Sequence, residues 1–347
     1  MPTGAFTFAV APSDGNVAYT CSVAGGAHLA IWVSQDRAAH WTHTATIPVQ
    51  AGTTQCNVTV DGLQPMTAVV AVNQIKLGGN PLITDYTSFV TFDGGQTWRQ
   101  LSPSYPYAVM QLSTRAGVVY AYLRYATGSP QNPLEEDPVL ATSHDQMRTW
   151  QTIFQNVTES VGFGGTAFWL NPDSGAVLVM GENSFASSMD AGAHWATVSV
   201  PGYGAQASAG ENIVVQVPAG KRPWHLCVAN DDVTYTRDPQ PTTLTCSTNG
   251  GQTWRPAPGL NLPFTNVKGT FVLPAGVFAV ADDGAVLATV YGPASLDATY
   301  YCLMTNSEQW QSFGLTPGAV TTNYYPGPGS GVLWAAESGG WVTTDYP

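Results

Sequence analysis

The feature that most constrains this chain is the octapeptide TFDGGQTW at residues 91–98. Asp93 can accept hydrogen bonds from backbone N–H groups of its own turn, and Gly95 can adopt the positive φ that a side chain resists. Thr91 offers a hydroxyl just before the acid, and Trp98 supplies a large ring that can pack between neighbouring sheets. The octapeptide therefore predicts a tight hairpin between two β-strands.

Weakened copies of the octapeptide recur roughly every fifty residues along the chain. They read SQDRAAHW at 34–41, SHDQMRTW at 143–150, SMDAGAHW at 188–195 and STNGGQTW at 247–254, with a shortened MTNSEQW at 304–310 and a partial TTD at 343–345. The turn acid or amide then falls at Asp36, Asp93, Asp145, Asp190, Asn249, Asn306 and Asp345, and the tryptophan at Trp41, Trp98, Trp150, Trp195, Trp254 and Trp310. A fixed repeat predicts one closed domain, residues 1–347, although the length alone would allow two domains.

These repeats resemble the Asp-boxes, or BNR repeats, of sialidase-like β-propellers, whose pattern is S/T-x-D-x-G-x-T-W. The resemblance covers the whole chain, in six in-phase copies. It implies a propeller, a fold shared by sialidases, xyloglucanase-type hydrolases, sortilin-type receptors and photosystem-assembly-factor-like proteins. Because so many activities share this fold, the fold alone does not select a function.

A second signal lies between the boxes, where a turn rich in Gly, Pro and Asp precedes a β-branched and aromatic run. The turns fall at 12–16, 61–65, 113–117, 171–175, 218–223, 282–285 and 326–331. We therefore predict an all-β propeller of seven blades, each with four antiparallel strands named A to D from the axis outward. The expected blades are approximately 5–48, 56–103, 107–155, 160–201, 211–258, 267–317 and 318–347.

In the first blade we expect strands at 6–11, 17–23, 28–34 and 41–48, and the nearly continuous apolar B strands should be buried on both faces. The last predicted blade has no D strand. Either it is incomplete, or a strand from the N-terminal side completes it, as is usual in propellers. Six blades, as in true sialidases, is the alternative.

Composition limits the partners and the compartment. Charged residues make up 10% of the chain and the net charge is −12, which disfavours nucleic acids and anionic membranes, because both attract basic surfaces. No apolar run is long enough for a membrane helix, and the first residues lack the features of a signal peptide. Low charge with many Thr, Gly and Trp residues is nevertheless typical of exported proteins. We expect a secreted or surface-displayed monomer whose signal or anchor lies outside this sequence.

The five cysteines show no metal-ligand spacing. Cys227 and Cys246 fall centrally in two strands that we expect to be adjacent, so they could form a cross-strand disulfide in an oxidising compartment. The alternative is that the cysteines, which also include Cys21, Cys56 and Cys302, are small buried side chains.

Propeller geometry places the A–B turns and the boxes on one rim, and the B–C and D–A loops on the other. Resemblance to sialidases implies that a site lies on the second rim, where two B–C loops, 125–138 and 229–241, are long. The candidate catalytic residues there are Glu135, Glu136, Asp231 and Asp232. The candidate ligand-binding residues are Tyr105, Tyr107, Arg124, Asp137, Glu159, Tyr203, Tyr235, Arg237 and Asp238, with Lys76, Tyr291 and Asp297 on the same rim.

Carboxylates and tyrosines on one rim suit a sugar, since the acids can bind hydroxyls and the rings can stack on apolar sugar faces. Paired carboxylates could also hydrolyse a glycoside if their separation is right. The alternative is that these acidic loops are only solvated. A structural calcium in one of them is conceivable, and no other cofactor is expected.

Classical sialidase activity is disfavoured by the residues. The family pattern requires an Arg-Ile-Pro motif, which is absent, and three arginines that clamp the substrate, whereas only Arg124 and Arg237 fall on the expected rim. No nucleophile elbow, phosphate loop or HExxH motif occurs either. The leading prediction is a non-catalytic propeller that binds a glycan or a protein partner through the B–C/D–A rim. The alternative is a glycoside hydrolase or lyase that uses carboxylates or tyrosines of the same rim.

Overall fold

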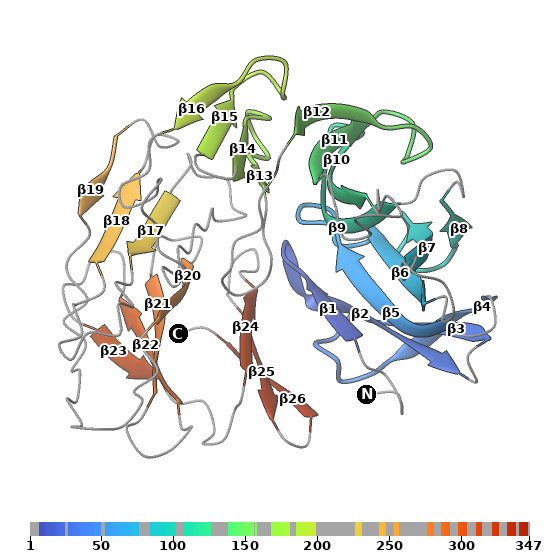
Figure 1. Ribbon diagram of the computed structural model, residues 1–347. Helices are drawn as coiled ribbons and strands as arrows, with labels where there is room; N and C mark the ends of the chain where they lie inside the picture. The colour runs from blue at the N-terminus through green and yellow to red at the C-terminus, as the bar shows by residue number, and fades with distance from the viewer. Residues whose placement is uncertain are drawn as a thin grey trace. The chain divides into compact units, whose positions relative to one another are not determined.

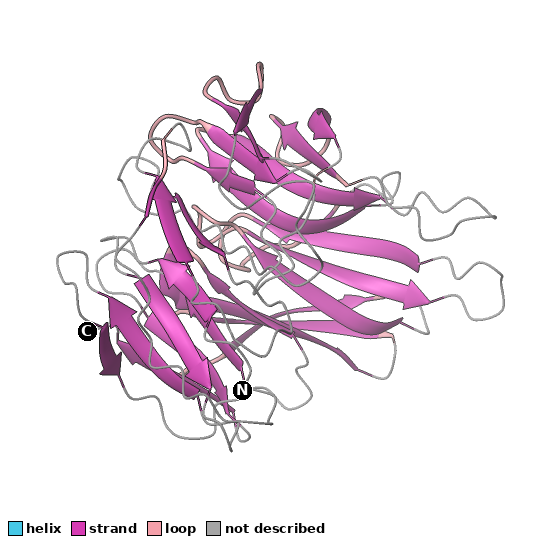
Figure 2. Cartoon of the chain, turned by 60° about the vertical axis from the view of Figure 1, so that its left-hand side comes forward, coloured by secondary structure: helices cyan, strands magenta, loops and turns pink. Residues whose placement is uncertain are grey.

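Every regular element that the structure describes is a β-strand, and the strands pair into antiparallel sheets in sequence order (Figure 1). This computed structural model describes residues 7–24, 27–49, 53–75, 84–101, 107–125, 138–155, 157, 168–180, 185–198, 226–230, 243–247, 253–256, 276–280, 286–291, 298–303, 310–313, 321–325, 332–337 and 340–345. In those residues no helix is present, and so none could span a membrane (Figure 2). The predicted all-β class is confirmed.

The chain divides into two compact units, Met1–Thr158 and Glu159–Pro347. The first unit contains three sheets of four strands. Its strands are β1 (Thr7–Ala11), β2 (Asp14–Ala24), β3 (His28–Ser34) and β4 (Thr42–Pro48); β5 (Thr53–Val60), β6 (Ala68–Ile75), β7 (Thr84–Thr91) and β8 (Arg99–Gln100); and β9 (Tyr107–Arg115), β10 (Val118–Tyr125), β11 (Val139–Ser143) and β12 (Gln151–Gln155).

The second unit contains four sheets, of which two have four described strands and two have three. The strands are β13 (Phe168–Leu170), β14 (Val177–Met180), β15 (Phe185–Ser188) and β16 (Ala196–Val198); β17 (Leu226–Asn230), β18 (Thr243–Ser247) and β19 (Arg255–Pro256); β20 (Gly276–Val280), β21 (Val286–Tyr291), β22 (Ala298–Leu303) and β23 (Trp310–Phe313); and β24 (Thr321–Tyr325), β25 (Val332–Glu337) and β26 (Gly340–Asp345). The described residues thus form seven sheets in all, and the four-stranded antiparallel sheets that we predicted are present. The blade count and the closure of the ring stay predictions.

The core of the first unit lies between its sheets, as the middle strand β6 shows by burying both of its faces. In β6, Val70 and Val72 pack with Leu29 and Ile31 of the first sheet. The intervening Val69 packs instead against the third sheet, with residues such as Val109, Val119, Ala121 and Leu123. Side chains of a strand alternate between faces, so a continuous apolar run fills two interfaces at once. The predicted two-sided burial of this strand is confirmed.

A disulfide joins the first and second sheets. Cys21 of β2 and Cys56 of β5 are bonded, with their Cα atoms 6.3 Å apart, and both side chains are buried. The sequence suggested a disulfide only between Cys227 and Cys246. Cys21 and Cys56 are buried, as one of the two alternatives had it, but their bond was not predicted. The two bonded residues are far apart in sequence and lie in different sheets, so only the packing of the sheets brings them together.

Candidate functional site

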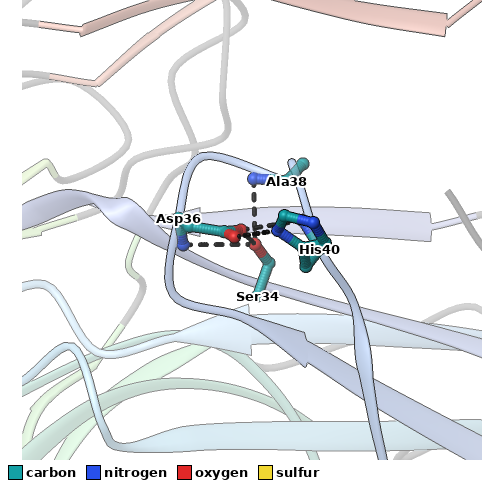
Figure 3. A network of polar contacts seen from close by, with 4 residues as sticks. All are labelled: Ser34, Asp36, Ala38 and His40. Carbon is teal, nitrogen blue, oxygen red and sulfur yellow. Dashed lines mark hydrogen bonds and ion pairs between the residues drawn. The ribbon is translucent and has the colours of Figure 1, made fainter.

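The best-defined polar geometry in the structure is that of the box turns. In the first box the Ser34 hydroxyl donates to Asp36 Oδ1 at 2.9 Å and accepts a hydrogen bond from the Ala38 N–H at 2.9 Å (Figure 3). Asp36 Oδ1 also accepts the His40 N–H at 2.9 Å, and the His40 ring lies with Nδ1 2.6 Å from Asp36 Oδ2. Both carboxylate oxygens of Asp36 are therefore engaged within its own turn.

The other described boxes repeat this network. Asp93 Oδ1 accepts the Thr97 N–H at 2.9 Å, which confirms the predicted bond to its own turn, and the Thr97 hydroxyl donates to Oδ2 at 2.6 Å. In the third box, the N–H and the hydroxyl of Thr149 bond to Asp145 in the same way. In the fourth box, the N–H and the ring of His194 bond to Asp190. His40 and His194 thus fill the position that threonine fills in the second and third boxes, so their Nδ1 atoms serve the turn.

The hydrogen bonds set the protonation state of the box acids. The N–H and then the ring of His40 hold the pKa of Asp36 at about 2, below its ordinary 3.8. The backbone N–H of Thr149 lowers the pKa of Asp145, and the ring of His194 lowers that of Asp190. Acids that are ionised and fully engaged in a turn cannot donate a proton near neutral pH. The four described boxes therefore do not supply a general acid.

The boxes and the A–B turns lie at the same end of their sheets. The Arg37 N–H donates to the Asn16 carbonyl, and the Gly94 N–H donates to the Met66 carbonyl, so a box is bonded to the A–B turn in each of the first two sheets. In the third sheet the register pairs Val119 with Ser143, the first residue of the box. The other end of each sheet is consequently the end at which the candidate ligand residues are expected.

Three polar residues occupy neighbouring backbone positions at that other end of the third sheet. The register pairs Tyr125 with Tyr107 and Arg124 with Ala108, so Arg124 and two tyrosines stand on neighbouring positions of two strands. Tyr107 and Arg124 are candidate residues from the sequence, and the structure brings their backbones together. Tyr125 entered the prediction only as the start of the long loop 125–138, whereas it is the last residue of β10.

The Arg124 side chain is held by a buried phenol. Its Nε donates to the Tyr122 hydroxyl at 3.2 Å, and the Tyr122 side chain is only 1% exposed. Val119, Ala121 and Leu123 of the same strand pack toward the second sheet, so Tyr122 and Arg124 share the opposite face. Arg124 is half-buried at the end of β10, which restricts its guanidinium more than a fully exposed position would. Tyr122 was not among the residues predicted from the sequence, although its spacing of two residues from Arg124 was the available signal.

The remaining candidates lie outside the described residues. These are Glu135, Glu136, Asp231, Asp232, Tyr105, Asp137, Glu159, Tyr203, Tyr235, Arg237 and Asp238, together with Lys76 and Asp297 and with the box residues Asn249 and Asn306. For Tyr107, Tyr125, Tyr291, Trp310 and Asp345 the structure describes the backbone alone. Within the described part of the chain no three His, Cys, Asp or Glu residues are grouped closely enough to hold a metal ion.

A buried carboxylate that the sequence analysis treated only as a turn residue links the second and third sheets. Asp61 is fully buried, and its Oδ1 accepts the N–H groups of Leu63 at 2.8 Å and Gln64 at 2.9 Å. The Thr114 hydroxyl of β9 donates to Asp61 Oδ2, and the Thr114 N–H donates to Oδ1 at 3.0 Å. Burial raises the pKa of Asp61, and the bonds from Thr114 and the turn oppose that rise. Asp61 therefore joins the second and third sheets through hydrogen bonds, at the box end.

Comparison with known proteins identifies the fold. No family model matches the chain, and no curated protein matches it. Among solved structures, YCF48 from Cyanidioschyzon merolae superposes with a TM-score of 0.53 at 14% identity, over 99% of this chain and 96% of that one. A polysaccharide lyase of family PL25, an ulvan lyase bound to -[GlcA(1-4)Rha3S]-, gives 0.52 at 12% identity over 99% and 93%.

A third similar solved structure is described as a β-propeller. The β-propeller domain of the trilobed protease from Pyrococcus furiosus gives a TM-score of 0.51 at 8% identity, over 100% of this chain and 96% of that one. At such low identities the likeness carries the fold and no activity. The chain therefore has the fold of a β-propeller.

Proposed function

We propose that this chain is an exported or surface-displayed β-propeller that binds a glycan, without transforming it, at the end of the sheets opposite the boxes. The observation that carries the proposal is the half-buried Arg124, which Tyr122 holds at that end of the third sheet, with Tyr107 and Tyr125 at neighbouring backbone positions. A guanidinium donates several hydrogen bonds in one plane, which suits sugar hydroxyls and carboxylates. Tyrosine rings stack on the apolar faces of sugars.

The proposed export has separate support from cysteine chemistry. A disulfide such as Cys21–Cys56 persists in oxidising compartments and is rare where glutathione keeps thiols reduced. Both cysteines are buried between two sheets, which shields the bond from soluble reductants. We expect the chain to reach an oxidising compartment before the first and second sheets finish packing.

We propose further that the repeats are true Asp-boxes and that the ring has seven blades. The support is the shared turn network of the four described boxes and the seven sheets in the described residues. Six blades would require two of those sheets to belong to one blade. A crystal structure with seven sheets around one axis would establish the count, and a six-sheet ring would refute it.

The enzymatic alternative is a glycoside hydrolase or lyase on the same rim. The fold likeness to an ulvan lyase is compatible with it and does not select it. Glu136→Gln and Asp232→Asn, made separately, distinguish the two functions. An enzyme should lose orders of magnitude in rate while it keeps much of its affinity, whereas a binding protein has no rate to lose.

The test of binding uses arginines at opposite ends of the third sheet. The full chain is screened on an array of neutral, uronate-containing and sulfated oligosaccharides, and the best ligand is titrated against Arg124→Gln. We expect the variant to lose affinity by about tenfold or more, since a hydrogen bond from a charged donor is worth roughly 1.5–3 kcal/mol.

Arg148→Gln is the matched control, because Arg148 is exposed within the third box, at the other end of the sheet. Its affinity should stay within about twofold of the parent, since surface substitutions remote from a contact have small effects. Equal losses in both variants would place the ligand elsewhere. If no sugar binds and a protein partner is captured instead, the chain is a protein-binding propeller rather than a glycan-binding one.

A further inference from the structure

Two cysteines lie opposite each other on neighbouring strands of the fifth sheet. β17 and β18 pair antiparallel with Cys227 directly opposite Cys246. Directly opposite residues of antiparallel strands have Cα atoms about 4.5–5.5 Å apart, and a disulfide needs about 4.4–6.8 Å. The backbone therefore already holds the two positions within bonding range.

The remaining cysteine has no such counterpart. Cys302 of β22 stands opposite Leu287 on one side and Gln311 on the other. In the first unit the bonded Cys21 lies on a B strand and its partner Cys56 lies on the A strand of the next sheet. Cys227 also lies on a B strand, but β20 of the next sheet has the sequence GVFAV, without a cysteine. Among the described strands, the cysteine directly opposite Cys227 is therefore Cys246 of its own sheet.

We propose that Cys227 and Cys246 form a second disulfide, that this bond lies within one sheet, and that Cys302 is the single free thiol. The five cysteines then divide into one bond between sheets, one bond within a sheet and one thiol. The bond would close the segment 231–242, which begins directly after β17 and ends directly before β18. That segment carries Asp231, Asp232, Tyr235, Arg237 and Asp238.

The chemistry balances by thiol–disulfide exchange with a disulfide donor of an oxidising compartment. One cysteine thiolate attacks the donor disulfide, which forms a mixed disulfide and releases one donor thiolate. The second cysteine thiolate then attacks the mixed disulfide, which forms the Cys227–Cys246 bond and releases the second donor thiolate. The chain loses two electrons and two protons, and the donor is reduced to its dithiol form.

The tryptic map of this chain makes the test unambiguous. Because Arg222 and Arg255 precede prolines, trypsin places the five cysteines in five different peptides, 1–37, 38–76, 222–237, 238–268 and 269–347. The full chain, refolded with oxidised and reduced glutathione, is alkylated without reduction, digested and analysed by mass spectrometry. We expect peptide 222–237 linked to 238–268, peptide 1–37 linked to 38–76, and peptide 269–347 alkylated.

Two variants control the map. Cys302→Ser should keep both links and abolish alkylation of the unreduced chain. Cys227→Ser should free the thiol of Cys246 and raise the number of alkylated cysteines from one to two. Alkylation of both Cys227 and Cys246 in the parent chain would overturn the proposal, and so would a link from either of them to peptide 269–347.

A consequence for ligand binding rests on the proposed function. If residues 231–242 contribute to the glycan site, the double variant Cys227→Ser/Cys246→Ser should bind more weakly than the parent, because the ends of the segment are no longer tied together. Unchanged affinity in the double variant, with the predicted link present in the parent, would leave the disulfide in place and remove that segment from the site. The peptide map and the binding assay can therefore fail independently.

Discussion

The boxes of the second and third sheets make the same hydrogen bonds with different residues at their two left-handed positions. The second box uses Gly94 and Gly95, with φ of 71° and 89°. The third uses Gln146 and Met147, with φ of 58° and 65°. A residue other than glycine costs about 1–2 kcal/mol in this conformation. The turn network therefore suffices to hold a strained backbone, and glycine is one solution rather than a requirement.

The two boxes also differ in how the residue at the second left-handed position packs. A Cβ added to Gly95 would lie 2.9 Å from Val33 Cγ2 and 3.2 Å from Thr44 Oγ1, so the first sheet occupies the space that a side chain would need. Met147 is only 1% exposed and packs in the core between the second and third sheets. In the second box, glycine avoids backbone strain and leaves room for the first sheet. In the third box, Met147 keeps a strained backbone, and its large side chain is buried in the core.

The largest expected effect is that of Gly95→Ala. The variant combines left-handed strain, about 1–2 kcal/mol, with overpacking against Val33 and Thr44, about 1–3 kcal/mol. We expect a loss of about 4 kcal/mol of unfolding free energy, measured as a shift of the urea midpoint. Gly117→Ala is the matched control, because its φ is 79° and no atom lies within 4 Å of the added Cβ. Equal losses in the two variants would show that strain alone, without the packing, explains the choice of glycine.

The second prediction concerns Met147, where we expect the glycine variant to be more stable than the alanine variant. Met147→Ala should lose about 3 kcal/mol, because it empties a core position and keeps the left-handed strain. Met147→Gly removes the same contacts but relieves the strain, so it should be more stable than Met147→Ala by about 1 kcal/mol. Thermal unfolding of both variants decides the order. If glycine is the worse of the two, the backbone at this position is not strained.

The sequence was informative about local structure because the box chemistry is local. Ser or Thr, Asp and a donor six residues after the first position account for the turn without reference to the rest of the fold. The alternation of β6 between two interfaces could also be read from its continuous apolar run. Both follow from short-range periodicity and turn chemistry.

Tertiary contacts could not be read in the same way. Nothing in DGLQP distinguishes the fully buried Asp61 from an exposed turn acid, because its burial depends on Thr114 of the next sheet. The Cys21–Cys56 bond likewise depends on how two sheets pack. For the candidate site, the sequence placed Arg124 on the expected rim, but the phenol that orients it, Tyr122, became apparent only from its burial and its hydrogen bond.

The first box offers a smaller and stabilising change. Ala38 has a φ of 61° and donates its N–H to Ser34, and its side chain belongs to none of the described core clusters. Ala38→Gly should therefore relieve strain without losing burial and raise stability by about 1 kcal/mol. Calorimetry should show a higher unfolding temperature. A lower one would mean that the greater freedom of glycine in the unfolded chain outweighs the relief.

The smallest expected effect is the acid response of Asp36, which is exposed. Its folded pKa of about 2 lies below the ordinary 3.8, because the N–H and ring of His40 bind the ionised form. A lowered pKa means that the stabilisation is fully present above about pH 4 and is lost as the pH falls through about 2. Asp36→Asn keeps an oxygen for the His40 N–H but cannot ionise. The difference in urea midpoint between the parent and this variant should therefore shrink between pH 4 and pH 2. If the difference stays constant over that range, the charge of Asp36 does not stabilise the turn, and its oxygen atoms act only as hydrogen-bond acceptors.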